Sequence, residues 1–167
     1  MRAVLARLSD ANRDYRWSDP SLLHVTLAFL GEQPEERLGS LEQIGAASAG
    51  VSRGGVLRLG NAGQFGGKRA PRVLYVDLAG DTEALLALQR RVNAGLRQDG
   101  FPTEDRPFRA HITLARRRES AQGGPPSGWP PEVEHAAFTL KQLTLMQSRL
   151  SSRGPTYTPL FHFPLAG

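Results

Sequence analysis

The stretch HVTLAFLGE occupies residues 24–32, and a second version of it, HITLARRRE, occupies residues 111–119. Five of the nine positions are identical in the two stretches, and a sixth exchanges one β-branched residue for another. A β-branched residue next to threonine, with apolar residues on either side, is typical of a β-strand. Both stretches are therefore predicted to be strands.

Alternation along a strand determines which side chains of each stretch lie together. Residues two apart lie on the same face of a strand. His24 and Thr26 therefore share a face in the first stretch. His111 and Thr113 share a face in the second, and the apolar residues between them are expected to point toward a core. If the two strands face each other, the space between them holds two imidazoles and two hydroxyls.

The composition excludes several classes of protein. The chain has 167 residues and no cysteine, which excludes disulfides, thiolate metal sites and cysteine nucleophiles. No run of 18 apolar residues occurs, and the N-terminus lacks the apolar core of a signal peptide. A cytoplasmic protein without a membrane span is therefore predicted.

The charge of the chain is strongly basic and comes from arginine. The formal net charge is +5, and 19 of the 21 basic residues are Arg. Arginine binds phosphate through a planar pair of donors, and a basic surface attracts nucleic acid. An Arg-rich chain is also typical of a GC-rich genome, so the charge alone leaves both interpretations open.

Periodicity and turn residues predict the order of the helices and strands. Helices are expected over residues 1–17, 34–49 and 81–99, with Asp81 as an N-cap and Gly100 as a terminator. Strands are expected over residues 22–30, 56–59, 72–78, 107–117, 135–141, 143–150 and 157–165. Loops are expected over 60–70 and 119–131, and a turn at 154–155. A strand–helix–strand order occurs twice, which predicts an α+β fold of two pseudo-symmetric lobes of antiparallel sheet with helices outside and a cleft between.

The paired His-x-Thr-Leu stretches resemble the 2H phosphoesterases. The wider context is similar to the bacterial RNA 2′,3′-cyclic phosphodiesterases, also called 2′–5′ RNA ligases. That context consists of RPFRAHITLAR at 106–116, LAFLG at 27–31, PRVLYV at 71–76 and QS at 147–148. The resemblance implies one bilobal domain over residues 1–167 with both stretches lining the cleft. Relatives usually begin with a short apolar strand that this sequence does not show, so we expect that strand to be missing at the N-terminus.

The resemblance also implies an activity. It implies hydrolysis of RNA 2′,3′-cyclic phosphate ends to 2′-phosphates, with His24 as proton donor and His111 as proton acceptor. The reverse reaction would be an ATP-independent 2′–5′ ligation. Histidine suits both proton transfers because its ordinary pKa is about 6.5. The two stretches are nearly identical, so the sequence itself leaves the assignment of acid and base open.

Other residues are candidates to bind the substrate. Thr26 and Thr113 can donate hydrogen bonds to phosphate oxygens. Arg116 matches a family arginine that approaches the phosphate, but it lies five residues after His111, an odd offset. It can reach the same face only if the strand ends or bulges near residue 115, or if its side chain curls round. Phe65 and Phe108 are candidates to stack on a base, with core packing as the alternative.

Three other functions remain open. A zinc hydrolase would need added ligands that neither stretch offers. A non-catalytic module could hold RNA ends without turnover. A related 2H enzyme could act on another cyclic phosphate or on 2′–5′ oligonucleotides.

The resemblance and composition together set expectations about partners. No metal is expected, because two histidines can carry out both proton transfers without one. No nucleotide cofactor is expected, since no phosphate-cradling Gly-x-x-x-x-Gly-Lys-Ser/Thr loop occurs. The expected partner is RNA that ends in a 2′,3′-cyclic phosphate, such as tRNA fragments. The protein is expected to be a monomer that does not associate with membranes.

Overall fold

The computed structural model describes residues 5, 6, 8, 9, 12–121, 123–151 and 154–166. The strands are β1 (Tyr15–Trp17), β2 (Gly55–Gly67), β3 (Ala70–Gly80), β4 (His111–Arg117), β5 (Ala137–Leu140), β6 (Gln142–Ser151) and β7 (Gly154–Pro164). The helices are α2 (Leu38–Gly50) and α3 (Thr82–Gln98), with 3-10 turns η1 (Pro20–Leu22) and η2 (Glu35–Arg37). The predicted α+β class is confirmed. In the described part of the chain, no helix is long and apolar enough to cross a membrane.

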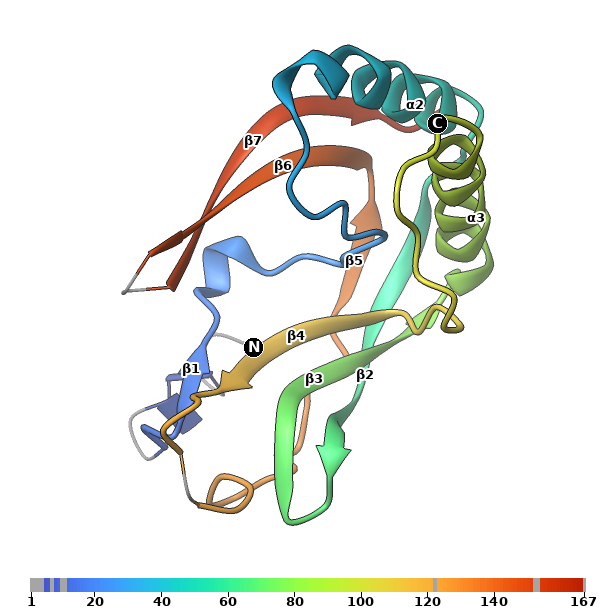
Figure 1. Cartoon of the computed structure of the whole chain (residues 1–167). Coiled ribbons are helices and arrows are strands. Elements are labelled where there is room, and N and C mark those ends of the chain that lie inside the picture. The colour runs from blue at the N-terminus through green and yellow to red at the C-terminus, as the bar shows by residue number, and fades with distance from the viewer. Residues whose placement is uncertain (1–4, 7, 10–11, 122, 152–153, 167) are drawn as a thin grey trace. The chain divides into compact units, whose positions relative to one another are not determined.

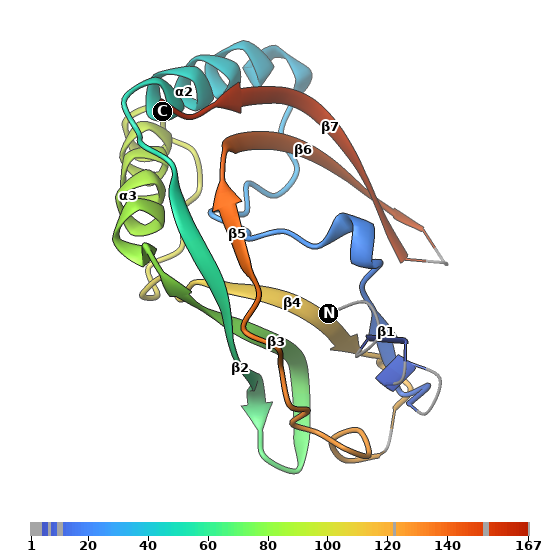
Figure 2. The same ribbon diagram turned by 180° about the vertical axis from the view of Figure 1, so that it is seen from behind.

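The strands form two sheets. One has five strands in the order β1-β4-β3-β2-β5, and the other is the β6–β7 hairpin. Figure 1 shows β4 between β1 and β3, and Figure 2 shows β5 along β2. Antiparallel pairing joins β4 to both of its neighbours. β4, which carries the second His-x-Thr stretch, is therefore an inner strand with a partner on each side.

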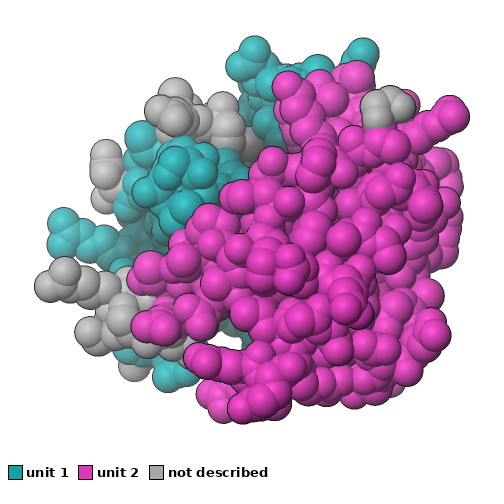
Figure 3. Space-filling view, turned by 90° about the horizontal axis from the view of Figure 1, so that it is seen from above, with its two compact units in different colours: residues 1–25, 58–79, 110–137 teal, residues 26–57, 80–109, 138–167 magenta. Residues whose placement is uncertain are grey.

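The contacts divide the chain into two compact units, which Figure 3 colours separately. Unit 1 comprises residues 1–25, 58–79 and 110–137, and unit 2 comprises residues 26–57, 80–109 and 138–167. His24 and the whole of β4 belong to unit 1.

The beginning of unit 1 differs from the prediction. Residues 5, 6, 8 and 9 are helical, but the predicted helix does not continue to residue 17, because Tyr15–Trp17 forms β1. Tyr15 and Trp17 pack with Leu74 and Ala115, while Arg16 between them is exposed. This alternation is that of a strand with one buried face. The expectation of a missing first strand concerns the start of the chain, where residues 1–4 lie outside the described part.

The first His-x-Thr stretch is not the continuous strand predicted over residues 22–30. A 3-10 turn at 20–22 precedes it, and the Asp19 carboxylate caps this turn by accepting a hydrogen bond of 2.7 Å from the Ser21 amide. Val25 then forms a single antiparallel bridge to Ile112 of β4. After Val25 the chain leaves unit 1, and its apolar side chains pack in unit 2 instead of extending the ladder. Because the side chains after Val25 pack in the core of unit 2, the first His-x-Thr stretch pairs with β4 only at Val25.

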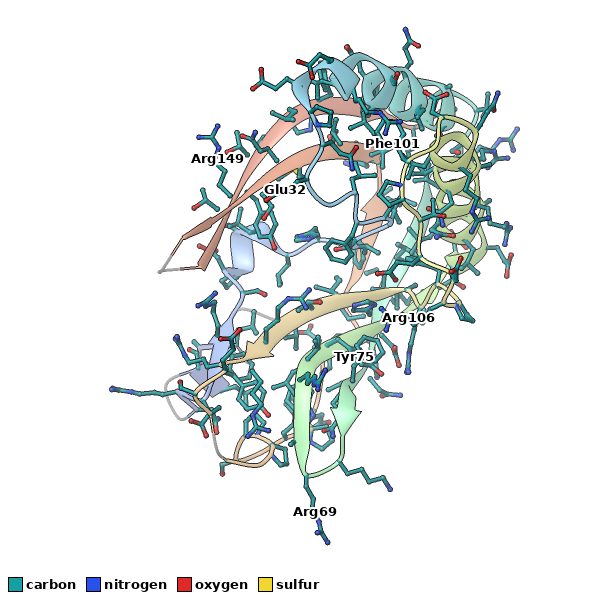
Figure 4. The ribbon with its side chains drawn as sticks, viewed as in Figure 1. Glu32, Arg69, Tyr75, Phe101, Arg106 and Arg149 are labelled. Carbon is teal, nitrogen blue, oxygen red and sulfur yellow. The ribbon has the colours of Figure 1, made fainter. Side chains whose placement is uncertain are left out.

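The glycine-rich segment predicted as a loop over residues 60–70 is mostly strand. β2 continues to Gly67, and β3 begins at Ala70. A Cβ atom on Gly63 would lie 2.6 Å from the Tyr75 ring, so glycine here allows a close approach instead of a turn. The connection is thus only two residues long, and Arg69 projects from its tip in Figure 4.

Unit 2 contains both long helices and the β6–β7 hairpin. The predicted apolar stripe of α3 is confirmed, because Leu85, Leu88, Val92 and Leu96 are all buried. The last three of these residues pack with Leu41 and Phe101 in one core. Asp81 precedes α3 as predicted, but its carboxylate accepts a hydrogen bond of 2.7 Å from the Val56 amide and does not cap the helix. Gly100 follows α3 with a φ of 67°, as expected for a terminator.

The remaining predicted elements need smaller changes. The strands predicted over 72–78, 135–141, 143–150 and 157–165 correspond to β3, β5, β6 and β7, and the helix predicted over 34–49 corresponds to η2 followed by α2. The strand predicted over 107–117 begins only at His111. The predicted turn at 154–155 is wrong, because both residues pair with β6. The predicted loop over 119–131 contains no helix or strand among its described residues.

Tyr15 offers a test of how β1 is held in unit 1. Its side chain is 2% exposed, and its hydroxyl lies 3.1 Å from the Pro71 carbonyl oxygen and 3.3 Å from that of Gly124. Tyr15→Phe should reduce the free energy of unfolding by about 1 kcal/mol, because a buried carbonyl loses its donor. Thermal unfolding at pH 7 measures this loss, and an unchanged melting temperature would contradict it.

The same variant should also change the pH dependence of stability. Burial raises the pKa of Tyr15 above 10.0, while nearby Arg117 opposes the shift. The folded chain therefore keeps the phenol proton to higher pH than the unfolded chain does. This contribution to stability is present below pH 10 and is lost as the pH rises through the folded-state pKa. Tyr15→Phe should accordingly lose less stability above pH 10 than the wild type.

Candidate functional site

The pairing of β3 with β4 defines one face of the sheet in unit 1. His111 lies opposite Asp77, and Thr113 lies opposite Tyr75. Opposite residues of an antiparallel pair point to the same side of the sheet. Ile112, between the two motif residues, is buried and points to the other side. We call the side that carries His111 and Thr113 the motif face.

β4 contains a β-bulge immediately after Thr113. Tyr75 pairs with Thr113 and its neighbour Leu74 pairs with Ala115, so Leu114 is an additional residue on β4. Leu114 and Ala115 are both fully buried, although they are consecutive. Two consecutive buried residues break the alternation of the strand, as expected at a bulge.

The bulge returns Arg116 to the motif face. Arg116 pairs with Val73, and Val73 lies two residues before Tyr75 on the regular part of β3. Val73 and Tyr75 therefore share a face, and Arg116 shares it with them. The odd offset from His111 to Arg116 would have pointed the arginine away in a regular strand. The condition stated from the sequence, a bulge near residue 115, is met.

His24 is placed beside this face by the bridge between Val25 and Ile112. Val25 points to the same side as Ile112, so the preceding residue, His24, turns toward the side of Thr113. Nδ1 of His24 lies 2.7 Å from the carbonyl oxygen of Leu22. A carbonyl can only accept, so this contact favours a proton on Nδ1.

Two aromatic rings contact the imidazole of His111. The centroid of Phe65 lies 5.0 Å and that of Tyr75 lies 5.4 Å from the imidazole centroid, with interplanar angles of 84° and 64°. Phe65 and Tyr75 stack on each other at 4.3 Å. Tyr75 is 2% exposed, and Figure 4 shows it on β3. The two rings restrict the orientation of His111.

The structure does not bring every predicted residue into unit 1. Thr26 follows Val25 and belongs to unit 2, as does Phe108, and both are half-buried. The remaining candidates all lie in unit 1; they are His24, Phe65, His111, Thr113 and Arg116. Phe65 packs against Tyr75 and His111, which was the alternative to base stacking.

Sequence reasoning missed three residues on the motif face or beside it. Tyr75 and Asp77 reach it from β3, and Arg16 reaches it from β1 because it pairs with Arg116. Asp77 could have been noticed as the one charged residue within the apolar run 73–78. Arg16 could not have been noticed in the sequence, because its position depends on the pairing of β1 with β4, and the sequence pattern predicted a helix there. Among the described residues, no three His, Asp or Glu side chains are grouped to hold a metal ion.

Comparison with known sequences identifies relatives along the whole chain. Residues 2–150 match the 2′-5′ RNA ligase superfamily. A protein of Thermus thermophilus named RNA 2′,3′-cyclic phosphodiesterase is 34% identical over 176 residues, which cover 100% of this chain and 85% of the relative. A Bacillus subtilis protein of the same name is 30% identical, over 90% of this chain and 81% of its own length.

Solved structures share the fold. TT0787 of Thermus thermophilus superposes with a TM-score of 0.80 at 32% identity, covering 99% of this chain and 93% of its own. Escherichia coli LigT complexed with 3′-AMP gives a TM-score of 0.77 at 26% identity, covering 99% of this chain and 91% of LigT. The expected 2H phosphoesterase fold is thereby confirmed.

Gly63 tests whether the aromatic contacts orient His111. In Gly63→Ala the new Cβ would meet the Tyr75 ring at 2.6 Å, so Tyr75 and Phe65 must shift. We expect a loss of about 1–3 kcal/mol in the free energy of unfolding from overpacking, together with displaced NMR resonances of the His111 imidazole. Gly67→Ala on the same strand is the control, because nothing lies within 4 Å of its Cβ. Identical spectra for the two variants would contradict the proposed contact.

Proposed function

Because the chain belongs to the 2′-5′ RNA ligase superfamily, we propose that it is an RNA 2′,3′-cyclic phosphodiesterase that produces 2′-phosphate ends. The observation that carries this proposal is the placement of His24, His111, Thr113 and Arg116 on or beside one face of unit 1. Relatives that match over most of their length carry the same name.

The reaction needs two proton transfers on opposite sides of one phosphorus. His111 takes a proton from water, and the water oxygen attacks phosphorus. The bond from phosphorus to the ribose 3′-oxygen breaks, and His24 gives that oxygen a proton. The product carries a 2′-phosphate and a 3′-hydroxyl. One imidazole begins neutral and the other begins charged, as general acid–base catalysis requires.

The contact between His24 and Leu22 suits the role of acid. The Leu22 carbonyl holds the proton on Nδ1, so the transferable proton is the one on Nε2. His24 and His111 each adjoin a residue of the Val25–Ile112 bridge, which supports their acting on the same phosphate group.

Charge on the phosphate oxygens grows in the transition state, and donors beside it lower the barrier. The Thr113 hydroxyl and the Arg116 guanidinium lie on the same face as His111 and serve as these donors. Thr26 serves as a further donor from the first stretch, and Phe108 serves as a contact for the terminal base, while Phe65 orients His111. Arginine offers two parallel N–H groups to a phosphate.

The proposal extends to the setting of the reaction. The chain is a monomeric cytoplasmic enzyme that acts on RNA fragments with cyclic ends, such as those of cleaved tRNA, and it requires no metal. The same steps in reverse join a 5′-hydroxyl to a cyclic end as a 2′–5′ bond, but an excess of water over RNA ends favours hydrolysis. The absence of cysteine supports the cytoplasmic location, and the basic charge supports RNA as the substrate.

An end-group assay tests the proposed activity. A short RNA with a 2′,3′-cyclic phosphate is incubated with the protein in the presence of a chelator, and the product is identified by mass and by its sensitivity to further enzymes. We expect a 2′-phosphate product. His24→Ala and His111→Ala should each reduce kcat by roughly 10²–10⁴-fold, since each removes one proton transfer. His162→Ala is the matched control, because this exposed histidine contacts Gln142 and Thr144 in unit 2.

The pH profiles of the same variants assign the two roles. The wild-type rate should fall on both sides of a maximum, because the base must be neutral and the acid must be charged. The residual activity of His24→Ala should lose the alkaline fall, and that of His111→Ala should lose the acidic fall. The reverse pattern would overturn the assignment, and a wild type without turnover on any cyclic end would overturn the function.

A further inference from the structure

Two arginines stand opposite each other at the edge of the motif face. Arg16 of β1 pairs directly with Arg116 of β4, so both side chains point to the same side of the sheet. The neighbours of Arg16 on β1, Tyr15 and Trp17, point to the other side and pack with Leu74 and Ala115. Both arginines are exposed. The pair therefore extends the motif face from β4 onto β1, the edge strand of the sheet.

This pairing does not stabilise the fold. Like charges directly opposite each other on neighbouring strands are destabilising. Within the described part of the chain, neither Arg16 nor Arg116 has a side-chain hydrogen bond or an ion pair. The next two arginines of β4 differ, because Arg117 donates to the Ala121 carbonyl at 2.9 Å and Arg118 donates to the Arg13 carbonyl at 3.0 Å. Arg16 and Arg116 thus keep their donors available for a ligand.

The charge of the pair indicates how many anionic groups the ligand carries. A 2′,3′-cyclic phosphate at the end of a single nucleoside carries one negative charge, which one arginine can neutralise. In the bound substrate, the second of two adjacent guanidinium groups is neutralised when a second anion lies beside the first. An RNA chain supplies that second anion in the phosphodiester that precedes its cyclic end.

We propose that Arg16 binds the phosphodiester immediately before the cyclic phosphate, while Arg116 reaches the cyclic phosphate itself. This inference rests on the proposed function and names its preferred substrate as an oligonucleotide instead of a cyclic mononucleotide. Arg16 lies one strand farther from His111 and Thr113 than Arg116 does, since the sheet order is β1-β4-β3. The RNA chain therefore crosses from β4 toward the edge strand β1, with its cyclic end beside His111 and Thr113.

The test compares two substrates with the same terminal base, a 2′,3′-cyclic mononucleotide and a trinucleotide with a 2′,3′-cyclic phosphate. Arg16→Gln should reduce kcat/KM on the trinucleotide by roughly 10–100-fold, as expected for a hydrogen bond to a charged group, and should leave the mononucleotide unaffected. The dependence of kcat/KM on salt should also weaken for the trinucleotide, since one phosphate contact is lost. Arg72→Gln is the control, because this exposed arginine follows the alternation of β3 onto the opposite face.

A modified substrate identifies the phosphate that Arg16 contacts. The trinucleotide is made with an uncharged methylphosphonate in place of the last phosphodiester. The wild type should then lose as much kcat/KM as Arg16→Gln loses on the natural trinucleotide, and Arg16→Gln should lose nothing further. Additive losses, an equal loss on both natural substrates, or no loss at all would each overturn the inference. A wild type inactive on both substrates would instead overturn the proposed function, and thermal melting confirms that the variants are folded.

Discussion

Antiparallel pairing of β4 with β3 is the interaction on which the motif face depends. Five consecutive residues of β3, from Val73 to Asp77, pair with β4, and β4 contains one additional residue, Leu114. The buried side of both strands carries leucine, isoleucine, valine and alanine side chains that are almost fully removed from water. Burial of this apolar surface fixes the register, because a slip by one residue would expose those side chains and bury the polar ones. The bulge then places Arg116 on the same side as His111 and Thr113.

The features that could be predicted from the sequence depend on local patterns. The apolar stripe of α3, the glycine after it, and the alternation of His111 with Thr113 are each visible within one segment. The bulge is not visible in this way, because it arises where Leu114 and Ala115 are both drawn into the same core. From the sequence, Arg116 is predicted to reach the face of His111 only if β4 contains a bulge. The pairing of β4 with β3 shows that bulge.

The wrong predictions also have tertiary causes. The sequence pattern predicts a helix through Tyr15–Trp17 because three residues carry too little periodicity to indicate a strand, and the segment becomes one through its pairing with β4. Gly63 is typical of a loop, but it makes room for the Tyr75 ring within a strand. The first His-x-Thr stretch has the composition of a strand, yet only Val25 finds a partner on β4. In each case a distant residue determines the local structure.

In the proposed mechanism, His24, Thr113 and Arg116 converge on one phosphate. The most direct measurement is a crystal structure of the protein with a nucleoside 2′-phosphate bound. We expect Nε2 of His24, the Thr113 hydroxyl and the Arg116 guanidinium all to lie within roughly 2.7–3.2 Å of phosphate or ribose oxygens. A phosphate bound away from the motif face, or an Arg116 side chain directed to the opposite side of β4, would contradict it.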